Sequence, residues 1–278
     1  MQLFVKAASL GLSVLLVCST ALGYYESHRN FPSKRGFSKS IPSKKGNLFF
    51  KDEAPPPVTV APSHEGVTFE CEAGGSPQPT IHWLKDGERI EQGVFDNSIE
   101  EETSFEDKTD KRGQRLLRLG STKGKLFLDC LGQESEGTYS CVAETPYKRI
   151  SRSSELQIDN VANTLPMGID TQRCLVKRSM KDGEPARIYL WTANRIEMEG
   201  ADVQLFCRAT GYPKPVITWV DIEGNLVQKG DDRYKILSNG DLLIHKISWK
   251  KNLGVYNCIA TNPTGTDKTE TFLYPTTP

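Results

Sequence analysis

The chain has 278 residues, of which 37% are hydrophobic, and this length accommodates two domains of about 100 residues each with flanking tails. The 35 basic and 35 acidic side chains balance, so the overall charge gives no support to a nucleic-acid partner. The sequence contains no nucleophile elbow, phosphate-binding loop or metal-ligand spacing, so we expect neither an enzyme nor a bound cofactor.

Residues 1–23 have the composition of a secretory signal peptide. Lys6 precedes an apolar run from Ala7 to Cys18, and a small-x-small sequence ends at Gly23. The run is shorter than the ~20 residues that a bilayer-spanning helix needs, which makes a membrane anchor the less favoured alternative. We therefore predict a secreted, extracellular protein that begins near Tyr24 and does not insert into a membrane.

Residues 24–53 are rich in Ser, Pro, Gly and basic side chains. Such a segment offers too little apolar surface to offset the entropy lost on ordering, so we expect a disordered basic leader. A basic arm for an acidic polysaccharide, and a pro-segment cut after Lys34 and Arg35, are the alternatives.

Residues 54–159 read as a first all-β domain. Val67, Phe69 and Cys71 alternate as an inward-facing strand, and Trp83 follows Cys71 in a second strand. The sequence G-x-Y-x-C at 137–141 closes the domain. A polar linker, 160–184, separates it from a second domain at 185–275.

A charged insertion lies in the first domain within 91–125, where an acidic run precedes a basic run. Clustered cations attract polyanions, so Arg112 and Arg115 are candidate contacts for a heparan-type polyanion. In an alternating strand, however, these two side chains would point to opposite faces. A solvated loop is therefore the favoured interpretation.

The second domain repeats the first. Cys207 and Trp219 follow Cys71 and Trp83 at the same offset of 136 residues, and both domains contain G-x-P-x-P-x-I-x-W. An offset kept without a gap indicates an internal repeat. The sequence G-x-Y-x-C recurs at 254–258.

The spacing of cysteine, tryptophan and tyrosine resembles that of the immunoglobulin superfamily. The resemblance implies two I-set-like β-sandwich domains in tandem, each with one disulfide between facing strands, a tryptophan packed on it and a tyrosine corner. The implied disulfides are Cys71–Cys141 and Cys207–Cys258, the tryptophans Trp83 and Trp219, and the corner tyrosines Tyr139 and Tyr256. The aspartate usual before the corner is replaced by Ser135 and Asn252.

Two further cysteines, Cys130 and Cys174, lie outside this pattern in a chain expected to meet an oxidising compartment. With Leu126, Leu128 and Leu131 facing inward, Cys130 falls on the outer face of its strand, away from the core pair. We predict a Cys130–Cys174 bond that straps the linker onto the first domain. Cysteines free for an intermolecular bond are the alternative.

The segments 237–244, 254–260 and 271–275 resemble the nematode zwei-Ig (zig) family and the related insect secreted protein that binds insulin-like peptides. The resemblance implies a secreted recognition protein that binds a cell-surface or matrix partner and maintains axon and cell-body position in the nervous system. The alternative is a soluble protein that sequesters an insulin-like peptide hormone. A contiguous apolar patch near the interdomain hinge would favour this carrier, whereas polar, aromatic-spotted loop ends would favour adhesion.

Loop ends supply the remaining candidate contacts. Tyr147, Lys148 and Arg149 lie in the turn after Cys141, and residues 262–266 form the matching turn of the second domain. Binding residues commonly lie on such loops, although an ordinary hairpin is the favoured interpretation.

Overall fold

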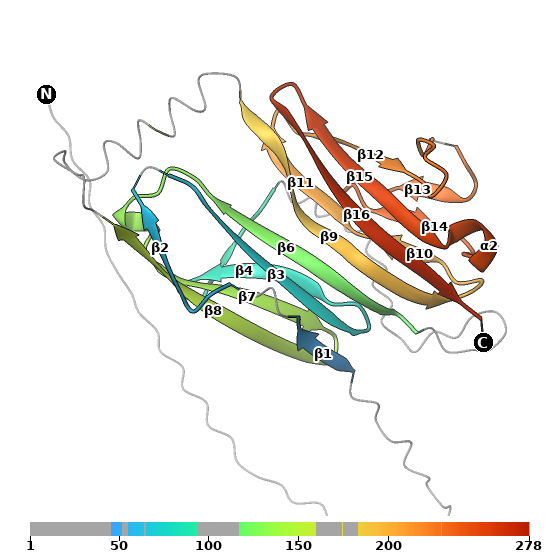
Figure 1. Cartoon of the computed structure of the whole chain (residues 1–278), viewed down its shortest axis with the longest axis horizontal. Coiled ribbons are helices and arrows are strands. Elements are labelled where there is room, and N and C mark those ends of the chain that lie inside the picture. The colour runs from blue at the N-terminus through green and yellow to red at the C-terminus, as the bar shows by residue number, and fades with distance from the viewer. Residues whose placement is uncertain are drawn as a thin grey trace, which may run out of the picture. The chain divides into compact units, whose positions relative to one another are not determined.

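The computed structural model describes residues 46–51, 55–63, 65–93, 117–159, 174, 183–228 and 230–277, which lie in one compact unit, Lys44–Pro278. The predicted all-β fold class is confirmed, because these residues form two β-sandwiches that follow one another along the chain (Figure 1). The short elements η1 and α2 are helical, and so is the described residue Cys174.

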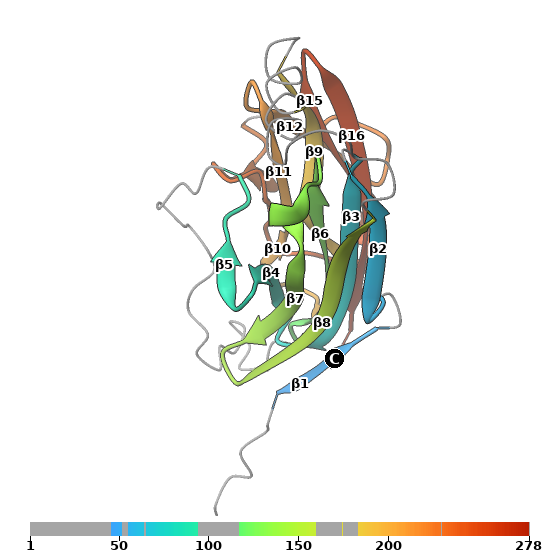
Figure 2. The same ribbon diagram turned by 90° about the vertical axis from the view of Figure 1, so that its left-hand side faces the viewer.

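The first sandwich packs a five-stranded sheet, of order β2-β8-β7-β4-β5, against strands β1, β3 and β6 of a larger sheet. Figure 2 shows this sandwich at the front, with β7 and β8 side by side. Its elements are β1 (Asn47–Phe50), β2 (Val58–Pro62), β3 (Val67–Ser76), β4 (Thr80–Lys85), β5 (Glu88–Ile90), β6 (Leu119–Leu128), η1 (Gln133–Ser135), β7 (Gly137–Thr145) and β8 (Lys148–Asp159).

Alternating apolar residues form the core of this sandwich. Phe69 lies with its ring centroid 5.4 Å from that of Tyr139 and 6.1 Å from that of Trp83, and all three are buried. The Tyr139 hydroxyl donates a hydrogen bond of 2.8 Å to the backbone carbonyl of Ser135. The tyrosine corner therefore forms without an aspartate, and burial raises the pKa of Tyr139 to about 12.

The second sandwich packs the strands β10-β14-β13 against β9, β16, β15 and β12, while β11 pairs with the first half of β9. Its elements are β9 (Glu184–Met198), β10 (Val203–Leu205), β11 (Cys207–Tyr212), β12 (Val216–Val220), β13 (Tyr234–Ile236), β14 (Leu242–Ile244), α2 (Trp249–Asn252), β15 (Gly254–Asn262) and β16 (Gly265–Thr276).

The second core contains the same combination of a disulfide, a buried tryptophan and a corner tyrosine, but different hydrogen bonds hold it. Trp219 is fully buried and its indole Nε1 donates to the carbonyl of Gly240 at 2.9 Å. The side-chain amide of Asn252 donates to the Tyr256 hydroxyl at 3.1 Å, and its Oδ1 accepts from the backbone N–H of Ser248 at 2.9 Å. Asn252 thus anchors the corner where the family pattern has aspartate.

Three disulfides are present, Cys71–Cys141, Cys207–Cys258 and Cys130–Cys174, the same pairs as those expected from the sequence. The strand predicted to carry Cys130 is shorter than expected, because β6 ends at Leu128; Cys130 is only 4% exposed, yet it is not a member of the first core cluster. Its φ of 55° reverses the chain beyond the strand, where the alternation of faces no longer holds.

The expected disorder of residues 24–53 is wrong at the end of that segment. Asn47–Phe50 forms β1, which pairs antiparallel with β3, and Leu48 is buried in the first core. The Phe49 ring lies over Gly74, where an added Cβ would stand 2.9 Å from a ring carbon. A glycine at this position therefore allows the strand to close over the sheet.

The two sandwiches share one sheet, which the sequence did not indicate. Strand β6 of the first pairs antiparallel with β9 of the second, and the ladder runs β1-β3-β6-β9-β16-β15-β12 (Figure 1). The pairing extends from Leu119 opposite Ile196 to Gly124 opposite Leu190. The domains are therefore joined side by side through backbone hydrogen bonds.

Candidate functional site

The outer face of the joined sheet carries a row of apolar side chains that crosses the domain boundary. Leu119 of β6 lies opposite Ile196 of β9, which lies opposite Tyr274 of β16. Two residues before Tyr274, Phe272 lies opposite Val255 of β15. Residues paired in a ladder, and residues two apart in one strand, point to the same face of the sheet.

Aromatic contacts extend this row to α2. The Trp249 ring meets the Tyr274 ring edge-on, with centroids 5.1 Å apart, and Phe272 lies 6.4 Å from Tyr274. We call these six residues the sheet-face patch: Leu119, Ile196, Trp249, Val255, Phe272 and Tyr274.

Four members of the sheet-face patch are exposed, Leu119, Trp249, Val255 and Phe272, while Ile196 and Tyr274 are partly buried. Phe272 is 43% exposed and Leu119 is 36% exposed, whereas Leu273, between Phe272 and Tyr274, is fully buried in the second core. A contiguous apolar surface of this kind marks interaction sites in soluble proteins. Residues 272–274 of β16 are therefore apolar on both faces, because one face covers the core and the other is available to a partner.

A buried polar network lies on the opposite face of the sheet at the junction. The side-chain amide of Gln78, from the β3–β4 turn, donates to Thr122 at 3.0 Å and to Thr192 at 2.8 Å. Its carbonyl oxygen accepts from Arg195 at 3.0 Å, and Arg195 forms an ion pair of 3.1 Å with Glu197. We call these five residues the junction network.

Glu197 also positions the start of β6. Its two carboxylate oxygens accept backbone N–H groups of Leu117 at 2.7 Å and of Arg118 at 2.8 Å. Glu197 is fully buried, so these charge-assisted bonds form in a medium that screens them weakly. The junction network thereby sets where Leu119 lies next to Ile196, which is what makes the sheet-face patch continuous.

A charged cluster borders the patch on the first domain. Glu72 forms ion pairs with Lys51 at 2.6 Å and with Lys123 at 3.5 Å, and it accepts from the Ser121 hydroxyl at 2.7 Å. Burial raises the pKa of Glu72, but the hydrogen bonds from Lys51 and Ser121 and the charges of Lys51 and Lys123 outweigh it, so that this pKa lies below its ordinary value.

The predicted loop contacts lie elsewhere. Tyr147, 54% exposed, belongs to the β7–β8 turn, and the Lys148 ammonium donates to the carbonyl of Leu48 in β1. Arg149 lies opposite Glu144 at the start of β8. This turn holds β1 and does not join the patch. Arg112 and Arg115 lie outside the described residues.

The matching turn of the second domain is occupied by its own hydrogen bonds. The Asn262 side chain accepts from the backbone N–H groups of Thr264 and Gly265 and donates to the carbonyls of Glu184 and Pro213. An asparagine side chain used in this way stabilises a turn, so this turn offers few polar groups to a partner.

Neither a candidate metal site nor a membrane-spanning helix is found in the described part of the chain. No group of three or more His, Cys, Asp or Glu side chains there is arranged to hold a metal ion. Nor does that part contain a helix long and apolar enough to cross a membrane.

Comparisons with known proteins agree with the architecture. Residues 53–145 match the model of an immunoglobulin domain and residues 192–274 that of an immunoglobulin I-set domain. Zwei Ig domain protein zig-4 of Caenorhabditis elegans is 33% identical over 80% of this chain and 78% of its own length. Neural/ectodermal development factor IMP-L2 of Drosophila melanogaster is 28% identical over 79% of this chain and 74% of its own.

The crystal structure of IMP-L2 superposes on this chain with a TM-score of 0.61 and 26% identity, covering 83% of this chain and 95% of that one. The similarity thus includes both sandwiches. The chain belongs to the family of two-immunoglobulin-domain proteins that contains the zwei Ig domain proteins and IMP-L2.

Proposed function

We propose that the protein is an extracellular binding protein whose sheet-face patch takes up the apolar surface of a peptide hormone of the insulin-like class. The observation that carries this proposal is the continuous apolar surface across β6, β9, β16 and β15. Removal of apolar surface from water drives association, and aromatic anchors contribute most of the binding energy of interfaces. Among the two functions that the family resemblance implies, a patch at the domain junction favours the carrier.

Three observations support an extracellular location. Residues 1–23 have the composition of a signal peptide, and three disulfides are typical of proteins that fold in an oxidising compartment. The two-domain relatives match most of the chain. A secreted binding protein that keeps a hormone from its receptor would use all of these features.

A second candidate function is the maintenance of axon and cell-body position through a cell-surface or matrix partner. It is favoured by sequence identity, which is 33% to zig-4 and 28% to IMP-L2. The same apolar surface would then bind a folded protein in place of a peptide. The two candidates therefore differ in ligand and agree on the site.

Calorimetric titration of the secreted protein with an insulin-like peptide tests the proposal. Leu119→Ser and Phe272→Ser each remove one anchor, one from each domain, and we expect each to weaken binding about tenfold. Val60→Ser is the matched control, because Val60 is 63% exposed in β2 and lies outside the patch. Its affinity should stay within about twofold of the unchanged protein.

Absence of binding at micromolar peptide, or equal losses for Val60→Ser and Phe272→Ser, would reject the peptide proposal. If the peptide does not bind but the protein captures a neuronal cell-surface protein in a manner that requires Leu119 and Phe272, the second candidate is correct.

A further inference from the structure

Strand β1 places one more aromatic side chain on the outer face of the joined sheet, beyond the six residues of the sheet-face patch. Phe49 is 43% exposed, while its neighbour Leu48 is buried in the first core. Successive side chains of a strand point to opposite faces, so Phe49 points away from that core. Its ring lies over Gly74 of β3, which agrees with this direction.

Phe49 belongs to a straight row that crosses both domains. Gly74 pairs with Ser121 of β6, which lies two residues after Leu119 and therefore on the same face. Paired strands lie about 4.8 Å apart, so four spacings place Phe49 about 19 Å from Phe272. The row has one residue from each of β1, β3, β6, β9, β16 and β15: Phe49, Gly74, Ser121, Asn194, Phe272 and Val255.

The position of Phe49 is fixed before any ligand binds. The backbone N–H of Lys51 donates to the carbonyl of Glu72 at 2.9 Å, and the Lys51 ammonium forms an ion pair of 2.6 Å with the Glu72 carboxylate. On the other side of Phe49, Leu48 packs in the core and its carbonyl accepts from the Lys148 ammonium at 3.4 Å. Because the strand is held on both sides of Phe49, little conformational entropy is lost when this ring meets a partner.

The residues that follow Phe49 in the row stand low. Gly74 has no side chain, and Ser121 is 1% exposed, with its hydroxyl group donating to Glu72 at 2.7 Å. An extended segment that follows one strand would meet only one of the two phenylalanine rings. A folded peptide with two apolar areas about 19 Å apart fits the row better, since small domains have diameters of about 30 Å.

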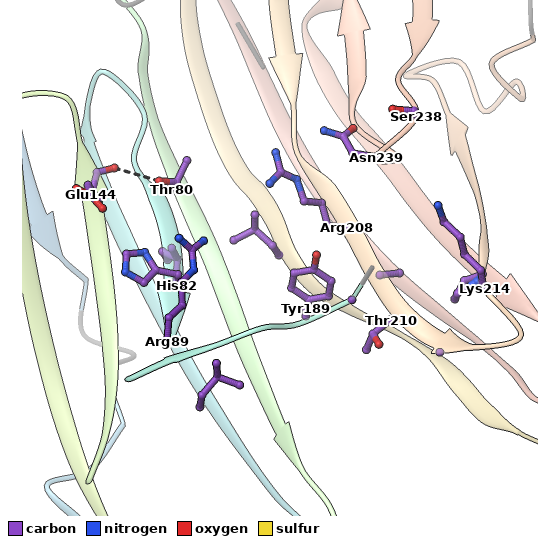
Figure 3. Close-up of a pocket in the computed structure, with 17 residues that line it drawn as sticks. Thr80, His82, Arg89, Glu144, Tyr189, Arg208, Thr210, Lys214, Ser238 and Asn239 are labelled. Atoms are coloured by element: carbon purple, nitrogen blue, oxygen red, sulfur yellow. Dashed lines mark hydrogen bonds between the residues drawn. The ribbon is translucent and has the colours of Figure 1, made fainter. Parts of the chain in front are cut away.

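The cleft between the two sandwiches does not offer an equivalent surface. It has a volume of about 540 Å³ and is lined by many polar and charged side chains, among them Thr80 and Asn239 (Figure 3). Its tyrosine, Tyr189, has Gly93 against the ring, and burial raises the pKa of Tyr189. The exposed phenylalanines of the described residues, Phe49 and Phe272, lie instead on the outer face of the sheet.

We propose that β1 is a further contact element for the ligand of the sheet-face patch, with Phe49 as its anchor. This inference rests on the proposed function and extends it: the hormone would be bound as a folded unit that meets Phe49 of the first domain and Phe272 of the second at once. Aromatic anchors contribute most of the binding energy of interfaces, and two anchors held at a fixed distance favour ligands that match that distance. The end of the basic leader would then take part in recognition.

Titration of the full chain with an insulin-like peptide tests the role of Phe49. Phe49→Ser should weaken binding about tenfold, as should Phe272→Ser, whereas Phe49→Leu, which keeps an apolar side chain over Gly74, should lose at most about threefold. Tyr212→Ser is the matched control, because Tyr212 is 70% exposed at the end of β11 and outside the row. Its affinity should stay within about twofold of that of the unchanged protein.

Hydroxyl-radical footprinting separates contact with the ligand from support of β1. The exposed Phe49 ring should be oxidised in the free protein and protected in the complex, while oxidation of Tyr212 stays the same. Backbone amide hydrogen exchange of β1 should be similar in Phe49→Ser and in the unchanged protein, since Leu48 and Lys51 still hold the strand.

Unchanged affinity of Phe49→Ser together with a loss for Phe272→Ser would overturn this inference and leave the proposed function standing. A Phe49 ring that is oxidised equally in the complex would also overturn it, even if Phe49→Ser binds weakly, because the ring would then only support β1. Absence of peptide binding to the unchanged protein would reject the proposed function, and this inference with it.

Discussion

The two sandwich cores and the junction between them are both buried, but they are built from different chemistry. The cores consist of apolar and aromatic side chains around a disulfide, such as Trp83 and Trp219. The junction instead contains Gln78, Arg195 and Glu197, all less than 8% exposed. Apolar packing is non-directional, whereas each buried polar group has to find a partner with correct geometry.

This difference explains how two similar domains acquire one fixed arrangement. An apolar contact between two sheets would tolerate several registers. In the junction network, a shift of β6 along β9 would leave the Glu197 carboxylate and the Gln78 amide without their partners. We infer that the polar groups specify the single register in which Leu119 lies opposite Ile196 and the sheet-face patch is continuous.

The largest expected loss of stability comes from a substitution in a core. Trp219→Ala removes a fully buried indole and its hydrogen bond to Gly240, and it should destabilise the protein by about 3–5 kcal/mol. Phe272→Ala, which truncates an aromatic residue exposed on the same domain, is the control and should cost less than about 1 kcal/mol. Chemical denaturation measures both, and similar losses would mean that Phe272 supports the fold.

A smaller loss of stability is expected from a substitution in the junction network that leaves both cores intact. Arg195→Ala leaves a buried carboxylate with its backbone donors only, and we expect a loss of about 3 kcal/mol. The rate of backbone amide hydrogen exchange should increase at β6 and β9, which open locally, before it increases at the disulfide-linked strands, which open only on fuller unfolding. Arg233→Ala, which breaks an exposed ion pair with Asp231, should cost at most about 1 kcal/mol.

Uniform exchange across the molecule of Arg195→Ala would contradict a local role for the junction network. Unchanged exchange at β6 and β9 would show that backbone pairing alone holds the domains together.

The smallest effect concerns the charged cluster beside the patch and depends on pH. The pKa of Glu72 is lower in the folded chain than its ordinary value of 4.5, so the stabilisation is present above about pH 4.5 and is lost as the pH falls through the folded value. Glu72→Gln should therefore reduce stability by about 1 kcal/mol at pH 7 and converge with the unchanged protein in acid.

Glu70→Gln, which removes an exposed partner of Lys125, is the control and should change stability less. A constant difference between Glu72→Gln and the unchanged protein from pH 7 to pH 3 would contradict the ionic origin of the effect.

Most of the fold could be predicted because it depends on local patterns. Alternating residues such as Val67, Phe69 and Cys71 indicate a strand with one buried face, and the repeated spacing of cysteine and tryptophan indicates two sandwiches. The strand predicted to carry Cys130 was too long, because the alternation stops where β6 ends at Leu128. The prediction of a disordered leader was wrong at β1, because the four residues Asn47–Phe50 gain their order from pairing with β3.

The candidate site could be predicted only in part. Alternation in the segment 271–274 shows that Phe272 and Tyr274 share one face, yet it does not show which residues of other strands lie beside them. Leu119 and Ile196 come from different domains, separated by 77 positions in the chain, and no local signal relates them. The loops chosen from analogy, such as Tyr147 to Arg149, instead hold β1 in place.

The sequence by itself determined the all-β class, the two repeated sandwiches and the residues at their centres, because the period of a strand and the spacing of the cysteine–tryptophan unit are properties of the chain near each residue. Only the tertiary structure decided that β6 pairs with β9, that Gln78 meets Arg195 beneath the sheet, and that apolar side chains from both domains meet above it. These contacts join residues far apart in the chain, and their free energy depends on which partner satisfies each buried polar group.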